Sequence, residues 1–288
     1  MDRFNSTVLA VYGTLIALAM GSTPPAQVVS TPAQAVAPAS ASLAPCLVAT
    51  PDGATAVLIR FRIEPHWHLY WSNPGDSGAP PAIKLTLPAG WTSGVTIFPR
   101  PEILGTAEER NFGYQDSLDL LIPVFGPKSD APSIAVEAKV DWLVCKTSCI
   151  MGRATLSEQV SISPDPKAPQ SRSRALPVKL PDSVRATLEG SPTQGSLVLS
   201  GATKSFGTLP VSFIPDPMSG VEYLDGTGPY LSRQVGDVTT IRVPFSIEPK
   251  DAVDGPPRLR GLVLTGKRDV DPAFQVDLKP SDVSAVEK

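Results

Sequence analysis

The sequence predicts an all-β protein built from two antiparallel β-sandwich domains in tandem, and three observations support this fold class. The chain of 288 residues contains 32 prolines and 22 glycines and is still 42% hydrophobic. This composition favours short strands joined by tight turns over long helices. Apolar and polar residues alternate in runs of strand length, with turn signals between the runs. The length exceeds that of a usual single domain, so two domains are expected.

The N-terminal segment predicts export followed by a tether. Residues 8–20 form an apolar stretch that fits the core of a signal peptide and is too short to cross a bilayer as a helix. Residues 1–22 are therefore predicted to be a signal peptide or an N-terminal anchor. Either assignment places the rest of the chain outside the cytoplasm, where disulfides persist. Residues 23–45 are rich in Ala, Pro, Ser and Thr, which predicts a disordered linker.

The first sandwich domain is predicted over residues 46–163. Its opening strand covers residues 57–63, in which apolar residues alternate with Leu58, Arg60 and Arg62. Residues 73–78, NPGDSG, are predicted to form a turn, because Pro presets one backbone angle and Gly supplies positive φ values. Further strands are predicted at residues 83–87, 95–98, 118–124, 134–145 and 154–162.

A Pro-rich linker is predicted over residues 164–180, followed by a second β domain over residues 181–288. Asp182 is expected to cap a short helix that ends at Gly190. The rest of this domain is predicted to form strands at residues 197–199, 211–214, 241–247, 259–264 and 274–278. The second domain contains neither Cys nor His, so the sequence places the candidate chemistry in the first.

Cys145 and Cys149 are the candidate redox residues. The strand before them places even-numbered residues on the core face, so Cys145 is expected to face outward as an accessible thiol. In an extended strand their Cα atoms would lie about 13 Å apart, whereas a disulfide needs less than about 7 Å. The strand is therefore expected to end at Cys145, with a turn before Cys149. So short a loop stabilises little, about 2 kcal/mol, and Lys146 favours the thiolate, so exchange is favoured over a structural disulfide.

Other residues offer alternative chemistry. His66 and His68 are two residues apart and would point the same way in a strand. With Met151 and the thiols they could form a soft copper site, although a solvated histidine pair is the simpler interpretation. Cys46 is expected to be an inert thiol. The net charge of −3 and the scattered basic residues argue against a nucleic-acid partner. No motif indicates a bound cofactor.

Several motifs in a fixed order resemble one known family. They are HWHLYW at residues 66–71, NPGDSG at 73–78, LPAGW at 87–91, FGY at 112–114 and WLVC at 142–145, with Cys149 after them. Together they resemble the periplasmic N-terminal region of the thiol:disulfide interchange protein DsbD family, particularly its ScsB-like branch. The resemblance covers the first domain strongly and the second only in general pattern.

This resemblance implies an immunoglobulin-like sandwich in which Cys145 and Cys149 form the redox pair. It implies that the pair receives electrons from a membrane-embedded donor and passes them to periplasmic thioredoxin-like proteins, with links to cytochrome c maturation and copper tolerance. His68, Tyr70, Asp76 and Tyr114 correspond to shielding or supporting positions. The cysteine spacing is shorter than in the best-known DsbD member and resembles the ScsB-like pattern.

The leading hypothesis is therefore an exported protein-disulfide reductase component whose only redox group is its disulfide. The chain carries no multi-span membrane domain, so the electron donor is expected to be a separate protein. A periplasmic copper-binding protein and a non-catalytic adaptor with a structural disulfide remain the alternatives.

Overall fold

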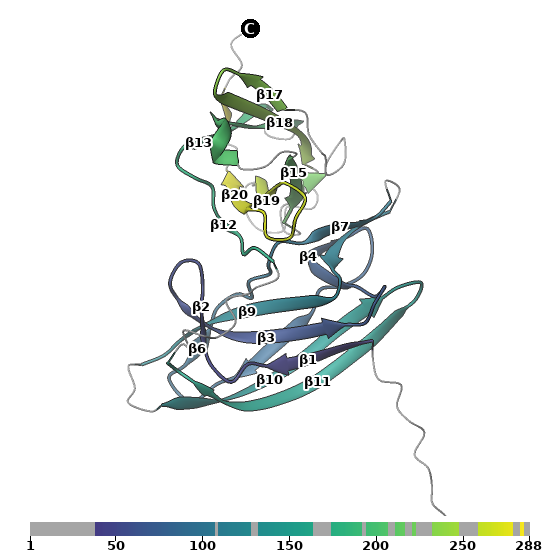
Figure 1. Cartoon of the computed structure of the whole chain (residues 1–288), viewed down its shortest axis with the longest axis vertical. Coiled ribbons are helices and arrows are strands. Elements are labelled where there is room, and N and C mark those ends of the chain that lie inside the picture. Colours follow the sequence, from purple (N-terminus) through teal and green to yellow (C-terminus); the bar gives the residue numbers. More distant parts are fainter. Residues whose placement is uncertain are drawn as a thin grey trace, which may run out of the picture. The chain divides into compact units, whose positions relative to one another are not determined.

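The computed structural model describes residues 38–106, 109–127, 132–163, 174–191, 194–206, 211–216, 221–222, 232–247, 259–278 and 283–284. These residues form strands, with one 3₁₀ turn at Thr203–Phe206, which confirms the all-β fold class (Figure 1). No helix in this part of the chain is long and apolar enough to cross a membrane. The predicted segment 1–22 and residues 23–37 and 164–173 of the predicted linkers lie outside the described residues. The predicted domain boundaries stay predictions.

Residues 38–163 form three antiparallel sheets. One has the strand order β1-β3-β9-β6, with β2 also paired to β3; the others are β11-β10-β5 and β4-β8-β7. The strands are β1 (Ala39–Leu43), β2 (Val48–Ala49), β3 (Thr55–Ile63), β4 (Leu69–Gly75), β5 (Ala82–Thr86), β6 (Thr92–Ser93), β7 (Glu102–Gly105), β8 (Arg110–Tyr114), β9 (Ser117–Phe125), β10 (Ser133–Cys145) and β11 (Cys149–Ser161).

The core of this part lies between the sheets that contain β3 and β10. The predicted odd-numbered residues of β3 and even-numbered residues of β10 are buried in one hydrophobic cluster. Phe61 of β3 meets Trp142 of β10 edge-to-face, with ring centroids 5.5 Å apart. Burial of a side chain such as Phe61 contributes about 1.5–3 kcal/mol to the free energy of folding. The alternation read from the sequence therefore sets the inner face of the hairpin that carries the cysteines.

Strand β1 corrects the predicted linker at residues 23–45. Residues 39–43 pair with β3 in antiparallel register, from Ala39 opposite Ile63 to Leu43 opposite Ile59. Ala39 is buried and Leu43 packs against the same core cluster, whereas the intervening serines lie on the other face. The alternation of small apolar residues with serine was therefore a strand signal, which the low-complexity composition concealed.

Residues 174–284 form two further sheets, with the orders β12-β20-β19-β15 and β16-β18-β14-β13-β21, and β17 also pairs with β18. The β12/β20 and β13/β21 pairs are parallel and the others antiparallel. The strands are β12 (Val178–Lys179), β13 (Val184–Gly190), β14 (Gln194–Ala202), β15 (Val211–Pro215), β16 (Val221–Glu222), β17 (Ser232–Val235), β18 (Val238–Ile247), β19 (Leu259–Thr265), β20 (Ala273–Leu278) and β21 (Val283–Ser284).

The helix predicted between Asp182 and Gly190 is wrong, because this segment forms β13. Val184 and Leu188 are buried in a second hydrophobic cluster, in which Ala186 is partly buried between them. These residues recur at every second position, which is the period of a strand. Tertiary packing of this face outweighed the local capping signal.

Candidate redox site

The two cysteines close the β10–β11 hairpin. Strand β10 ends at Cys145 and β11 begins at Cys149, and these residues lie opposite each other in the register. They form a disulfide with a Cα–Cα distance of 4.1 Å. The N–H of Lys146 donates to the carbonyl of Ser148 (3.0 Å), and the Lys146 side chain is exposed. The turn predicted from the spacing of the cysteines is confirmed.

The two cysteines differ in exposure. Cys145 is only 3% exposed, whereas Cys149 belongs to the exposed residues. The expectation that Cys145 is accessible is therefore wrong, although its position opposite to the buried even-numbered face is correct. The reason is a neighbouring segment: the N–H of His68 donates to Cys145 O (2.9 Å), and the N–H of Cys145 donates to His68 O (3.0 Å). These bonds hold the chain that enters β4 against the end of β10.

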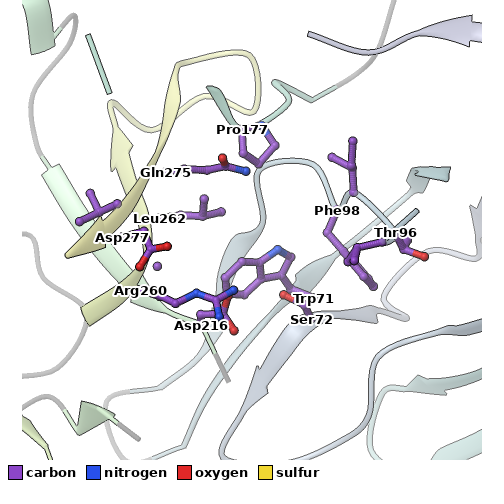
Figure 2. A pocket seen from close by; sticks show the side chains of 14 residues that line it. Trp71, Ser72, Thr96, Phe98, Pro177, Asp216, Arg260, Leu262, Gln275 and Asp277 are labelled. Atoms are coloured by element: carbon purple, nitrogen blue, oxygen red, sulfur yellow. The ribbon is translucent and has the colours of Figure 1, made fainter. Parts of the chain in front are cut away.

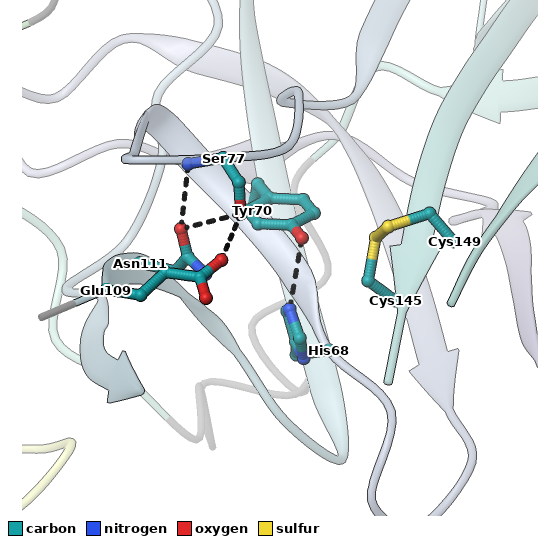
Figure 3. The surroundings of a disulfide bond; sticks show 7 residues. All are labelled: His68, Tyr70, Ser77, Glu109, Asn111, Cys145 and Cys149. Carbon is teal, nitrogen blue, oxygen red and sulfur yellow. Dashed lines mark hydrogen bonds between the residues drawn. A yellow bond between two sulfur atoms is a disulfide. The ribbon is translucent and has the colours of Figure 1, made fainter. Parts of the chain in front are cut away.

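His68 and Tyr70 lie beside the disulfide (Figure 3). Nε2 of His68 is 3.2 Å from the hydroxyl of Tyr70, and the two rings meet edge-to-face with centroids 5.0 Å apart. Tyr70 is 2% exposed. Burial lowers the pKa of His68. Burial also raises the pKa of Tyr70, an effect that a hydrogen bond with Ser77 partly offsets. Both changes favour the neutral form of each side chain, so the covered side of the disulfide carries an uncharged pair.

The turn predicted at residues 73–78 is only partly confirmed: residues 73–75 of the NPGDSG motif are the end of β4, and residues 76–78 form the loop that packs on Tyr70. Gly78 has φ +94°, and a Cβ atom at this position would lie 2.1 Å from Cζ of Tyr70. Only glycine lets the main chain approach the ring this closely. The loop therefore fixes the hydroxyl end of the ring, which is the end that contacts His68.

Hydrogen bonds hold this loop against β8. The N–H of Asp76 donates to the carbonyl of Arg110 (2.9 Å), and the Asp76 carboxylate accepts from the Arg110 N–H (2.6 Å). Ser77 donates through its N–H to Oδ1 of Asn111 (3.1 Å) and through its hydroxyl to Oε1 of Glu109 (3.3 Å), as Figure 3 shows. Asp76 thus supports the loop. Sequence reasoning named Ser77 only as part of the motif and missed Glu109 and Asn111, because only the tertiary fold brings β8 and the residue before it beside the motif.

Tyr114 occupies a core position. Its side chain is fully buried, and its hydroxyl donates to the carbonyl of Pro99 (2.9 Å). The guanidinium of Arg174 lies over the ring, 5.4 Å from its centroid. Burial raises the pKa of Tyr114 well above its ordinary value. These contacts assign Tyr114 to supporting the sheet β4-β8-β7.

The histidines do not form the pair expected for a strand. His66 precedes β4 in a turn, with φ +70°, and its side chain is exposed, whereas His68 is half-buried. Met151 lies on β11 and is 73% exposed. The described residues contain no group of three or more His, Cys, Asp or Glu side chains that could hold a metal ion. Cys46 is a half-buried free thiol whose backbone is bridged to Ser161, at the opposite end of β11 from Cys149.

A separate cavity of about 610 Å³ lies beside Trp71, the residue after Tyr70 (Figure 2). Successive strand residues point to opposite faces, so β4 directs Tyr70 toward the disulfide and Trp71 toward this cavity. Apolar side chains such as Phe98 and Leu262 line it together with Arg260, and its lining residues include neither Cys nor His. The candidate redox residues lie at the hairpin and not in the lining of this cavity.

Comparison with known proteins connects this site to one family. Residues 33–161 match the family model described as thiol:disulfide interchange protein DsbD, N-terminal. The N-terminal periplasmic domain of ScsB from Proteus mirabilis is similar in structure, with a TM-score of 0.54 and 18% identity, covering 84% of this chain and 92% of that chain. The major pilin subunit BcpA of Bacillus cereus gives a TM-score of only 0.25 at 9% identity, covering 86% of this chain and 68% of that one. No curated protein matches the chain.

Proposed function

Because residues 33–161 belong to the family of the DsbD N-terminal domain, we propose that this chain relays reducing equivalents by thiol-disulfide exchange outside the cytoplasm. The donor is a membrane-embedded protein of the DsbD or ScsB type, and the acceptors are periplasmic thioredoxin-like proteins, including those that serve cytochrome c maturation. The proposal is supported most directly by a disulfide with one exposed and one covered cysteine, Cys149 and Cys145.

The exposure difference assigns the two cysteines separate roles in reduction. A thiolate of the donor attacks Sγ of Cys149, because this residue is the accessible one. The Cys145–Cys149 bond breaks, a mixed disulfide forms between the donor and Cys149, and Cys145 leaves as a thiolate that takes up a proton. A second donor thiolate then attacks the donor sulfur of the mixed disulfide. The donor becomes oxidised, and this chain holds two thiols.

Delivery of the electrons reverses these steps. The Cys149 thiolate attacks the disulfide of the acceptor and forms a second mixed disulfide, with one acceptor sulfur leaving as a thiolate. The covered Cys145 then attacks Cys149, which restores the intramolecular disulfide and releases the acceptor as a dithiol. Two electrons pass through the cysteine pair, so the relay requires no bound cofactor.

The cover over Cys145 limits unwanted exchange. Attack requires access to a sulfur, and the pairing of His68 with Cys145 and the packing of Tyr70 leave only Cys149 exposed. A resolving thiol that solvent and foreign thiols cannot reach is preserved for the intramolecular step. We therefore assign His68 and Tyr70 to shielding, with Asp76 supporting the loop that packs on Tyr70.

Trapping of mixed disulfides tests this function. The Cys145→Ser variant should form a stable mixed disulfide through Cys149 with an oxidised thioredoxin-like protein, because the resolving thiol is missing. The Cys149→Ser variant should trap little, because its remaining thiol is buried. Non-reducing electrophoresis and mass spectrometry measure both. Absence of adducts with either variant, together with a wild-type disulfide that a dithiol cannot open, would contradict the proposed function.

A further inference from the structure

The outer edge of β11 is open next to the exposed cysteine. Strand β11 forms one edge of the sheet β11-β10-β5 (Figure 1). In the described part of the chain, backbone bonding on the outer side of β11 occurs only near its C-terminal end, where Ser161 meets residues 45–47. Strand β1 passes near β11 but forms no backbone hydrogen bonds with it among the described residues, so the outward backbone groups at the N-terminal end of β11, which carries Cys149, stay unpaired. An open edge is a template for pairing with another chain.

The backbone groups of Cys149 point toward this open edge. In an antiparallel pair, a residue directs both its N–H and C=O either toward its partner or away from it. Cys145 bonds through both groups to His68, on the side of β10 away from β11. Cys145 and Cys149 are therefore a non-hydrogen-bonded pair, and the N–H and C=O of Cys149 point outward, away from β10.

Every second residue of β11, counted from Cys149, directs its N–H and C=O away from β10. The hydrogen bonds of Ser161 at the C-terminal end of the strand agree with this pattern. Ser161, twelve positions after Cys149, donates through its N–H to Pro45 O (2.9 Å) and accepts from the Leu47 N–H (2.9 Å). By the same alternation, Met151 presents its N–H and C=O at the open edge. Cys149 and Met151 thus offer consecutive outward donor and acceptor groups beside the reactive sulfur.

Exposed apolar side chains mark the same end of the strand. Met151 is 73% exposed and Ile150 is 41% exposed. Met151 lies opposite Leu143 in the register and shares the face of the disulfide. The ion pair between Arg153 and Asp141 follows as the next cross-strand pair on that face. Ile150 points to the opposite face of the sheet, so on the face of the disulfide Met151 is an exposed apolar side chain beside a charged pair, a combination typical of an interaction site.

We propose that an extended segment of the thioredoxin-like exchange partner, adjoining its reactive cysteine, adds to this edge as a strand at Cys149 and Met151 and presents apolar side chains to Met151. This inference rests on the proposed function and specifies how the partner is recognised. Disulfide-bonded residues usually have Cα atoms about 4.4–6.8 Å apart, and opposite residues of antiparallel strands about 4.5–5.5 Å. A partner cysteine bonded to Cys149 from the open side therefore has its Cα atom at the distance from the Cα of Cys149 that a paired strand would have.

Replacement of an outward N–H by proline tests the pairing. Proline is tolerated at an edge where its N–H would face solvent, so Met151→Pro should leave the β10–β11 pairing intact. Met151→Ala removes most of the side chain but keeps the backbone N–H, so it measures the contribution of the side chain alone. Ser157→Pro removes another outward N–H of β11, eight positions from Cys149, and serves as the matched control. The full chain is oxidised, and its reduction is followed with two probes: dithiothreitol, which has no main chain, and a purified reduced thioredoxin-like protein with a Cys-x-x-Cys pair.

With the protein probe, we expect Met151→Pro to lower the second-order rate constant about tenfold, Met151→Ala to lower it less, and Ser157→Pro to leave it unchanged. Reduction by dithiothreitol should stay at the wild-type rate in all three variants. An unchanged rate for Met151→Pro with the protein probe overturns the inference, and so does an equal loss with both probes. Failure of the reduced wild-type chain to pass electrons to the oxidised form of the same protein probe would instead contradict the proposed function.

Discussion

Substitution of Gly78 by alanine tests whether the loop at residues 76–78 holds Tyr70 over Cys145. Gly78 has φ +94°, and an added Cβ would lie 2.1 Å from Cζ of Tyr70. The strained backbone costs about 1–3 kcal/mol, and displacement of a packed ring costs about 1–3 kcal/mol more. The free energy of unfolding should therefore fall by about 2–6 kcal/mol.

The Gly53→Ala variant is the matched control, because Gly53 has φ +85° and an added Cβ would meet nothing within 4 Å. It should lose only the backbone contribution of about 1–3 kcal/mol. Chemical denaturation of both oxidised proteins gives the difference. If displacement of Tyr70 relieves the remaining clash, alkylation of Cys145 in the reduced protein should be about five- to a hundredfold faster in Gly78→Ala than in the wild type.

Alkylation of Cys145 followed by peptide mass spectrometry measures this exposure residue by residue. Gly53→Ala should leave the Cys145 rate unchanged. Equal losses of stability in the two variants, with Cys145 alkylated at the wild-type rate in Gly78→Ala, would refute the idea that the loop secures the cover.

Three further predictions concern His68, the bond between Tyr114 and Pro99, and the ion pair between Arg60 and Asp119. Burial lowers the pKa of His68 below 6.5, so the unfolded state binds a proton first and stability should decline as pH falls below about 6.5; His68→Gln should remove that part of the pH profile. Tyr114→Phe should lower the free energy of unfolding by about 1 kcal/mol through the lost bond to Pro99, with an unchanged exchange rate. Asp119→Ala should cost about 1–3 kcal/mol in denaturation, because it leaves the half-buried Arg60 without its paired acceptors.

Strand alternation predicted the fold near the site but not the accessibility of the cysteines. The even-numbered residues of β10 line the core as expected, and the chain turns between Cys145 and Cys149 as their spacing required. The odd or even position of a residue in a strand predicts which face of the sheet its side chain is on. It does not predict whether another segment covers that face, and here residues 68–70 cover Cys145.

Long-range contacts also explain the other differences. The segment at residues 184–190 has a local capping signal but becomes a strand, because Val184 and Leu188 complete a hydrophobic cluster. His66 lies in a turn and has a positive φ, so it is not part of the strand. A histidine at this position does not predict such a backbone conformation. Asn111 and Glu109 reach the NPGDSG loop only through the pairing of β4 with β8. Local patterns thus located the reactive pair, and tertiary contacts determine which sulfur is exposed.

The reduction potential of the Cys145–Cys149 pair tests the central claim most directly. Equilibration of the full chain with defined thiol-disulfide buffers, followed by mass spectrometry of alkylated protein, gives this value. A relay that is reversibly reduced and oxidised should have a potential above about −300 mV. A potential below that value would identify a structural disulfide and contradict the exchange function, leaving the chain as a non-catalytic adaptor.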